Sequence, residues 1–118
     1  MATKTKVVTF NGAEFKLSIP TIGSKIRMQA IVQQQTRGMQ SFLSASYNQD
    51  AINAATLAVT LANLQSNVEK LKKGTQEVDY DFDFFNLEDS QETAELISFL
   101  AKELEDFISS FRSESQAK

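Results

Sequence analysis

The chain has 118 residues, a formal net charge of −3 at pH 7, and neither cysteine nor histidine. Its length predicts one domain with a real but modest hydrophobic core. The missing residue types exclude a disulfide framework, thiol chemistry, and the commonest general base and metal ligand of proteins. No apolar run is long enough to span a membrane, and the first residues lack the apolar core of a signal peptide. We therefore expect a protein that is made and kept in a cytoplasm and has no membrane partner.

The two ends of the chain carry opposite charge. Residues 1–37 hold six basic residues and one acidic residue, whereas residues 76–118 hold twelve acidic and three basic residues. Two explanations are open: the two halves attract each other within the fold, or one of them forms a charged surface for a partner. The basic residues are too sparse, and too free of interleaved aromatics, to indicate binding of nucleic acid.

Residues 5–19 predict a β-hairpin. Asn11-Gly12 suits a type I′ turn, because both central positions of that turn need positive φ. The two-residue loop fixes the register and places Phe10 opposite Ala13. One face of the hairpin is then apolar: Val8, Phe10, Ala13, Phe15 and Leu17. Because an isolated hairpin is marginal in water, this face is expected to pack on helices.

A helix is predicted over residues 22–36. Pro20 ends the preceding strand, because it has no N–H for the sheet, and Thr21 can cap the helix. The helix is poorly amphipathic, with apolar residues on two sides. One or two further helical turns are expected after it, from the spacing of Met39, Phe42 and Leu43.

The most apolar helix is predicted over residues 50–72, with Asp50 as its N-cap and Gly74 just beyond its end. One stripe repeats at intervals of four and three: Leu57, Leu61, Leu64, Val68 and Leu71. Only a narrow strip is polar: Asn53, Thr56, Thr60, Asn63 and Asn67. A helix that is apolar over most of its circumference is expected to be central, in contact with more than one neighbour.

Residues 75–88 form an acidic and aromatic connector. Apolar residues alternate with three Asp residues, which predicts a short edge segment or an extended loop. Tyr80, Phe82 and Phe84 fall on one side of it, together with Val78. The Asp spacing resembles the start of a calcium loop, but Phe84 stands where that loop needs Gly and Ser90 where it needs Glu. We therefore expect no metal site.

A last helix is predicted over residues 89–112, opened by a capping box of Asp89 and Glu92. Its seam repeats at intervals of three and four: Ile97, Leu100, Leu104, Phe107 and Phe111. Phe99 falls outside this seam, among acidic residues. It either contacts the hairpin or connector, or it faces a partner.

These elements predict a single domain, 1–118, that is mostly α with a small β part (α+β). The N-terminal β-hairpin is expected to pack on a bundle of three to four helices. No spacing of residues indicates a catalytic group or a cofactor: the four Gly residues match neither a phosphate loop nor a dinucleotide fingerprint. The sequence therefore predicts a protein that is not an enzyme.

The opening segment VVTFNGAEFKLSIPTIG resembles the start of a family of small phage tail proteins, usually described as tail assembly chaperones. The shared features are the hairpin turn at Asn11-Gly12, the passage Ile19–Gly23, an Ala/Leu-rich helix, and an acidic connector leading to a final helix with aromatics. The resemblance implies a protein without catalytic residues. It implies binding of an aggregation-prone tape-measure protein until tube subunits polymerise around it.

Such a role needs an exposed apolar surface. The candidate partner-binding residues are Phe99, Tyr80, Phe82 and Phe84. The resemblance equally suits a structural component of the virion, in the tail, baseplate or head–tail connector. A chaperone would stay in the host cell cytoplasm, whereas a structural component would be found in the virion. The sequence leaves open whether the protein forms a homo-oligomer.

Overall fold

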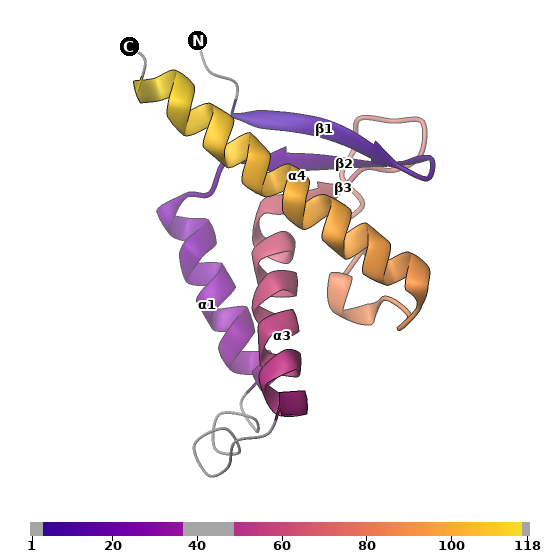
Figure 1. Ribbon diagram of the computed structural model, residues 1–118. Helices are drawn as coiled ribbons and strands as arrows, with labels where there is room; N and C mark the ends of the chain where they lie inside the picture. The colour runs from indigo at the N-terminus through magenta and orange to yellow at the C-terminus, as the bar shows by residue number, and fades with distance from the viewer. Residues whose placement is uncertain (1–3, 37–48, 117–118) are drawn as a thin grey trace.

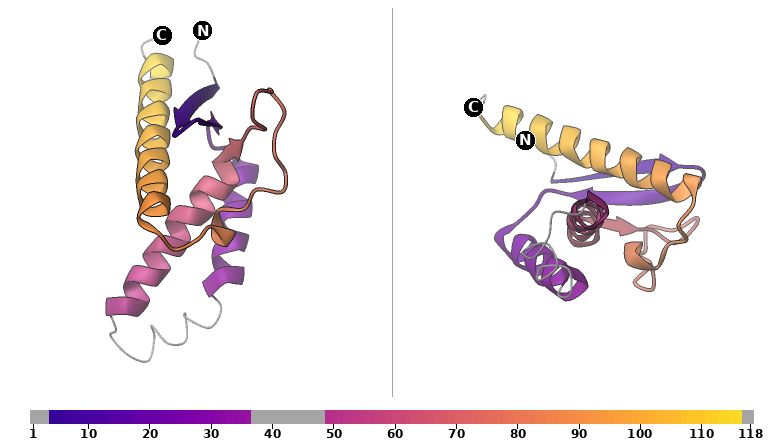
Figure 2. Two further views of the ribbon diagram at one scale, coloured as in Figure 1. Left: turned by 90° about the vertical axis from the view of Figure 1, so that its right-hand side faces the viewer. Right: turned by 60° about the horizontal axis from the view of Figure 1, so that its bottom comes forward.

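The computed structural model describes residues 4–36 and 49–116. Within these ranges a three-stranded antiparallel sheet carries three helices, so the predicted α+β class with an N-terminal hairpin is confirmed. Helices α1 and α3 form an antiparallel pair below the sheet, and α4 crosses one face of the sheet (Figures 1 and 2). The elements are β1 (Thr5–Phe10), β2 (Ala13–Ser18), α1 (Ile22–Thr36), α3 (Gln49–Asn67), β3 (Val68–Lys70), the 3₁₀ helix η1 (Phe84–Asn86) and α4 (Gln91–Gln116).

The hairpin has the predicted register, with Phe10 opposite Ala13 and Val8 opposite Phe15. Asn11 and Gly12 have φ values of 48° and 83°, as a type I′ turn requires. The apolar face of the hairpin enters the core, where Phe15 and Leu17 are 1% and 0% exposed. Local turn chemistry and side-chain alternation together therefore determine this element.

The predicted helix over residues 50–72 starts within one residue of the observed helix, but its predicted end and both predicted caps are wrong. It begins at Gln49, so Asp50 lies inside α3 and is not its cap. It ends at Asn67, and residues 68–70 become β3, which pairs antiparallel with β2. Gly74, at φ 75°, lies in a turn beyond that strand and does not cap the helix.

The reason for the helix-to-strand change is the free edge of β2. A two-stranded ribbon is marginal in water, and a third strand completes a sheet that α4 can cover. Val68 and Leu71 have the spacing of a helix seam, and this spacing is what extended the predicted helix too far. In the structure Val68 begins β3 and Leu71 follows it in an isolated bridge with Val78, and both side chains are buried, at 3% exposure each. Asn67, predicted on the polar strip, is also buried, and its amide donates to the Asn63 carbonyl oxygen at 3.0 Å.

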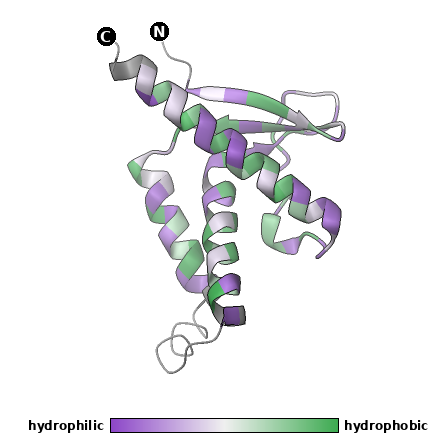
Figure 3. Ribbon diagram, in the orientation of Figure 1, coloured by the Kyte–Doolittle hydropathy of each residue, from purple (hydrophilic) through white to green (hydrophobic). Residues whose placement is uncertain are grey.

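Helix α1 has the predicted bounds and the predicted cap. The Ser24 N–H donates to Thr21 Oγ1 at 3.1 Å, and the Thr21 N–H donates to Ser24 Oγ at 2.8 Å. The helix packs along α3 and cannot bury both of its apolar sides. Ile22 and Ile26 are 83% and 65% exposed, and Figure 3 shows hydrophobic and hydrophilic residues mixed along the helix. The turns predicted around Met39, Phe42 and Leu43 lie outside the described residues.

The connector is a series of short turns, because its Asp side chains bond to nearby backbone. Leu71 and Val78 form an isolated bridge, and Asp83 Oδ1 accepts from the Phe85 N–H at 2.9 Å and caps η1. The predicted alternation therefore fails: Phe84 is 2% exposed and Tyr80 is 85% exposed.

Helix α4 begins at Gln91, and its N-cap lies one residue later than predicted. Ser90 is the residue that caps it: Ser90 Oγ accepts from the Thr93 N–H at 3.2 Å, and the Ser90 carbonyl accepts from the Ala94 N–H. Asp89 and Glu92 therefore do not form the box, because the helix that they were expected to open starts at Gln91. The predicted seam is confirmed by Leu100, Leu104 and Phe107, all buried.

The core lies where the sheet, α3, η1 and α4 meet. Its buried residues come from every one of these elements: Val8, Phe15, Leu17, Leu61, Leu64, Val68, Phe84, Leu100, Leu104 and Phe107. Within the described ranges, no helix has the length and apolar character needed to cross a bilayer.

Candidate partner-binding site

A surface cleft lies between α3 and the first turns of α4. Its volume is about 410 Å³. The floor is apolar and includes Leu57 from α3 and Ile97 from α4, and the rim includes Glu88 and Asp89. Leu57 is 49% exposed, so a large apolar side chain stands open at this cleft. We call this surface the α3–α4 cleft.

The connector supplies part of the lining of the cleft. Phe84 is held in the core, and its N–H donates to Gln65 Oε1 of α3 at 2.9 Å. Phe85 and Leu87 follow it and line the cleft between α3 and α4. Leu57 is 49% exposed at this cleft, whereas Leu61 and Leu64, further along α3, are 9% and 0% exposed.

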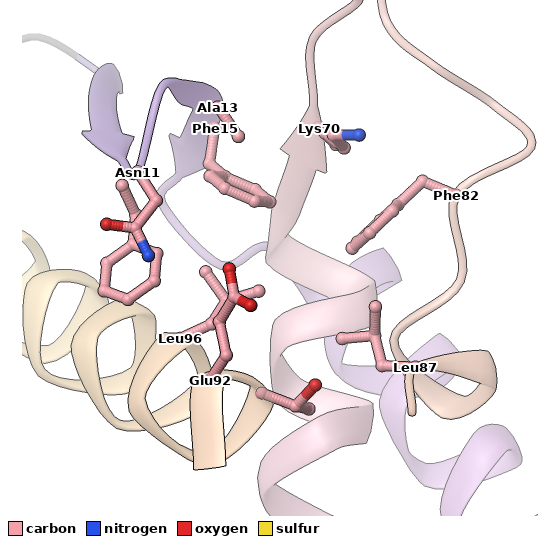
Figure 4. Close-up of a pocket in the computed structure, with 10 residues that line it drawn as sticks. Asn11, Ala13, Phe15, Lys70, Phe82, Leu87, Glu92 and Leu96 are labelled. Carbon is pink, nitrogen blue, oxygen red and sulfur yellow. The ribbon is translucent and has the colours of Figure 1, made fainter. Parts of the chain in front are cut away.

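A second, smaller hollow of about 240 Å³ lies beside the hairpin tip (Figure 4). Phe15 comes from β2, Lys70 from β3, Phe82 from the connector, and Glu92 and Leu96 from α4. Lys70 Nζ lies 5.3 Å from the centroid of the Phe82 ring, a cation–π contact that holds the ring on this wall. We call this surface the hairpin hollow. It shares Leu87 and Thr93 with the α3–α4 cleft, so the two hollows adjoin along α4.

The structure places the four predicted partner-binding residues in four different environments. Tyr80 is 85% exposed on the connector. Phe82 is half-buried and lines the hairpin hollow, with its ring edge-on to Phe84 at 4.8 Å between centroids. Phe84 belongs to the core, at 2% exposure, and so does not form part of the surface.

Phe99 contacts the hairpin, which is the first of the two alternatives that the sequence left open. Its ring lies 5.2 Å from the ring of Phe10 on the hairpin, with the planes tilted by 38°. It is half-buried against the core and lines neither of the two hollows. In the isolated chain this residue therefore joins α4 to β1.

The residues of the α3–α4 cleft were missed as a site by sequence reasoning. Leu57 was assigned to the buried seam because its spacing matches Leu61 and Leu64. Asp89 was assigned to the cap of the last helix, and Glu88 was not singled out as a site residue. The sequence does not predict where the connector passes α3, and that path affects which residues of the seam remain exposed.

The opposite charges of the two chain halves are joined by one ion pair within the part of the chain that the structure describes. Lys6 Nζ lies 3.7 Å from Glu103 Oε2, while the other pair, Lys72 with Glu77 at 3.9 Å, is local to the connector turn. Most acidic side chains of α4 therefore face solvent. Among the same described residues, no group of three or more acidic side chains is placed to hold a metal ion.

Comparison of the chain with protein-family models, with curated proteins and with solved structures finds no match. The two hollows and the sequence resemblance are therefore the features that bear on function. The arrangement is suited to holding an apolar segment of another protein: a floor of aliphatic and aromatic side chains, open at Leu57, with a polar rim.

Proposed function

We propose that this protein is a non-enzymatic, tail assembly chaperone-like protein of a bacteriophage. It binds other tail proteins, the tape measure or the tube, during morphogenesis in the host cell cytoplasm. The observation that carries the proposal is the α3–α4 cleft, where Leu57 is part of an apolar floor and stays 49% exposed. An apolar surface of this kind on a small domain is typical of a protein-binding site.

The cleft suits a holding function because it exists before the partner arrives. Leu61 and Phe84, which support its floor, are 9% and 2% exposed and belong to the core. A partner side chain that enters the cleft therefore displaces water from a rigid surface and leaves the fold intact. Burial of an aliphatic side chain such as Leu is worth roughly 1.5–3 kcal/mol, so a few anchors give a reversible complex.

The passage that carries the family resemblance has a structural role and an exposed part. Ile19 packs against the core, and Thr21 caps α1. Ile22 remains 83% exposed. The resemblance therefore includes a surface residue as well as the residues that shape the hairpin and the first helix.

The test is co-expression with the tape-measure protein of the same phage. The wild-type chain is expected to keep the tape measure in the soluble fraction, and Leu57→Asp is expected to lose that effect while it keeps its own fold. Val59→Asp is the matched control, because Val59 is 42% exposed on the same helix and lines neither hollow. A tape measure that is equally insoluble with and without the wild-type chain would refute the proposal.

A structural component of the virion is the second candidate. The observation that favours it is the exposed apolar side of α1, where Ile22 and Ile26 would be covered in a permanent assembly. Mass spectrometry of purified particles separates the two functions. A stoichiometric amount of this chain in the particle indicates a structural component, and its absence indicates a chaperone.

A further inference from the structure

The charge around the α3–α4 cleft is of one sign. Glu88 and Asp89 lie on its rim, and of the described residues that line it none is Lys or Arg. Glu92, in the first turn of α4, lines the adjoining hairpin hollow. The cation of the hairpin hollow, Lys70, is held over the Phe82 ring. The apolar floor is therefore bordered by carboxylates just before α4 and in its first turn.

The backbone of the cleft favours one kind of occupant. Its two walls are α3 and α4, whose N–H and C=O groups are used within the helices. An extended peptide laid between them would find few backbone partners, and its own polar groups would be left unpaired. The outer edge of β3 is also occupied, since the Asp79 N–H donates to the Lys70 carbonyl at 2.8 Å and the Lys72 N–H donates to the Glu77 carbonyl at 2.8 Å. A helix satisfies its own backbone and needs only an apolar stripe to fill the groove.

We propose that the α3–α4 cleft and the hairpin hollow together bind an amphipathic helix of the partner whose apolar stripe is flanked by Lys or Arg residues. The inference rests on the proposed function and gives the chemistry of the bound segment. Apolar side chains of the bound helix enter the α3–α4 cleft beside Leu57. The helix continues toward the hairpin hollow past Leu87 and Thr93, which line both hollows. The basic flank lies along Glu88, Asp89 and Glu92.

The probe is a synthetic peptide of about 18 residues with Leu at helical spacing i, i+3, i+4 and i+7 and Lys at the flanking positions. A second peptide carries Glu at every Lys position, and a third has the Lys peptide's composition in scrambled order. Isothermal titration calorimetry with the full chain is expected to show binding of the Lys peptide at least about tenfold tighter than of the other two. Circular dichroism of the complex is expected to show that the bound peptide is helical.

Matched variants separate the cleft from general attraction to an acidic protein. Glu88→Lys is expected to weaken binding of the Lys peptide about tenfold and to improve binding of the Glu peptide. Glu105→Lys changes the net charge by the same amount at an exposed position of α4 that lines neither hollow, and it is expected to change affinity less than about threefold. Leu57→Ser is expected to abolish binding and Val59→Ser to leave it unchanged.

Several results would overturn the inference. These are equal affinity for the Lys and Glu peptides, equal effects of the two charge reversals, or a bound peptide that is not helical. Sedimentation velocity tests a further alternative. If the wild-type chain is a dimer and Leu57→Ser is a monomer, a second copy of this chain occupies the cleft and the inference is wrong. If any of these is found while tape-measure solubility still depends on Leu57, the proposed function stands and only the chemistry of the partner is wrong.

Discussion

Replacing Phe99 with Ser removes the ring that joins α4 to the hairpin. The ring is half-buried and lies 5.2 Å from the Phe10 ring. Full burial of a Phe side chain is worth roughly 1.5–3 kcal/mol, so half-burial contributes about 0.75–1.5 kcal/mol. The contact between the two rings adds roughly 0.5–1.5 kcal/mol. We therefore expect Phe99→Ser to lower the free energy of unfolding by about 2 kcal/mol.

The assay is urea unfolding followed by circular dichroism, with a thermal melt beside it. For a domain of this size, 2 kcal/mol corresponds to a fall in Tm of about 8 °C. Lys102→Ser is the control, because Lys102 is exposed on the same helix and its replacement is expected to change stability by less than about 0.5 kcal/mol. A double-mutant cycle of Phe10→Leu and Phe99→Leu isolates the ring contact, with an expected coupling of about 0.5–1.5 kcal/mol.

The same variant also decides whether Phe99 contributes to partner binding. Because the ring lines neither hollow, the affinity per folded molecule for a tail protein is expected to stay unchanged. An unfolding curve identical to that of the wild type, together with weakened binding, would refute this placement of Phe99. It would show that the ring faces a partner and does not hold the hairpin on α4.

Three further substitutions test the fold. Gly12→Val is expected to destabilise the protein by roughly 1–3 kcal/mol in a melt, because φ is 83° there and a β-branched residue is strained at positive φ. Leu61→Asp is expected to give an insoluble or molten chain, because it brings an unpaired charge to a position that is 9% exposed. The control Thr56→Asp, at an exposed position of the same helix, is expected to stay folded. Equal melting curves for the two variants would contradict the orientation of α3. Ser90→Ala is expected to cost about 1 kcal/mol and Asp89→Ala less, because Ser90 Oγ accepts the Thr93 N–H; the reverse order in urea unfolding would make Asp89 the cap.

The sequence alone predicted the elements that are specified locally. The register of the hairpin follows from Asn11-Gly12 and from alternation, and both are determined within a dozen residues. The start of α1 follows from Pro20 and the Thr21 cap, and the seam of α4 follows from an unbroken repeat. Each of these signals is a short-range interaction between a side chain and its own backbone or face, so no knowledge of the fold was needed.

Only the tertiary structure decided β3, the environment of Phe99 and the α3–α4 cleft. Residues 68–70 have a pattern that serves a helix or a strand, and the free edge of β2, about fifty residues earlier in the chain, selects the strand. Phe99 lies outside the seam of its own helix, and the distant Phe10 supplies its contact. Leu57 and Leu61 are equivalent in the repeat of α3, but Leu61 belongs to the core and Leu57 stays open, at 9% against 49% exposure. Burial is a property of the assembled chain, because it depends on which distant segment covers a side chain, and no local repeat contains that information.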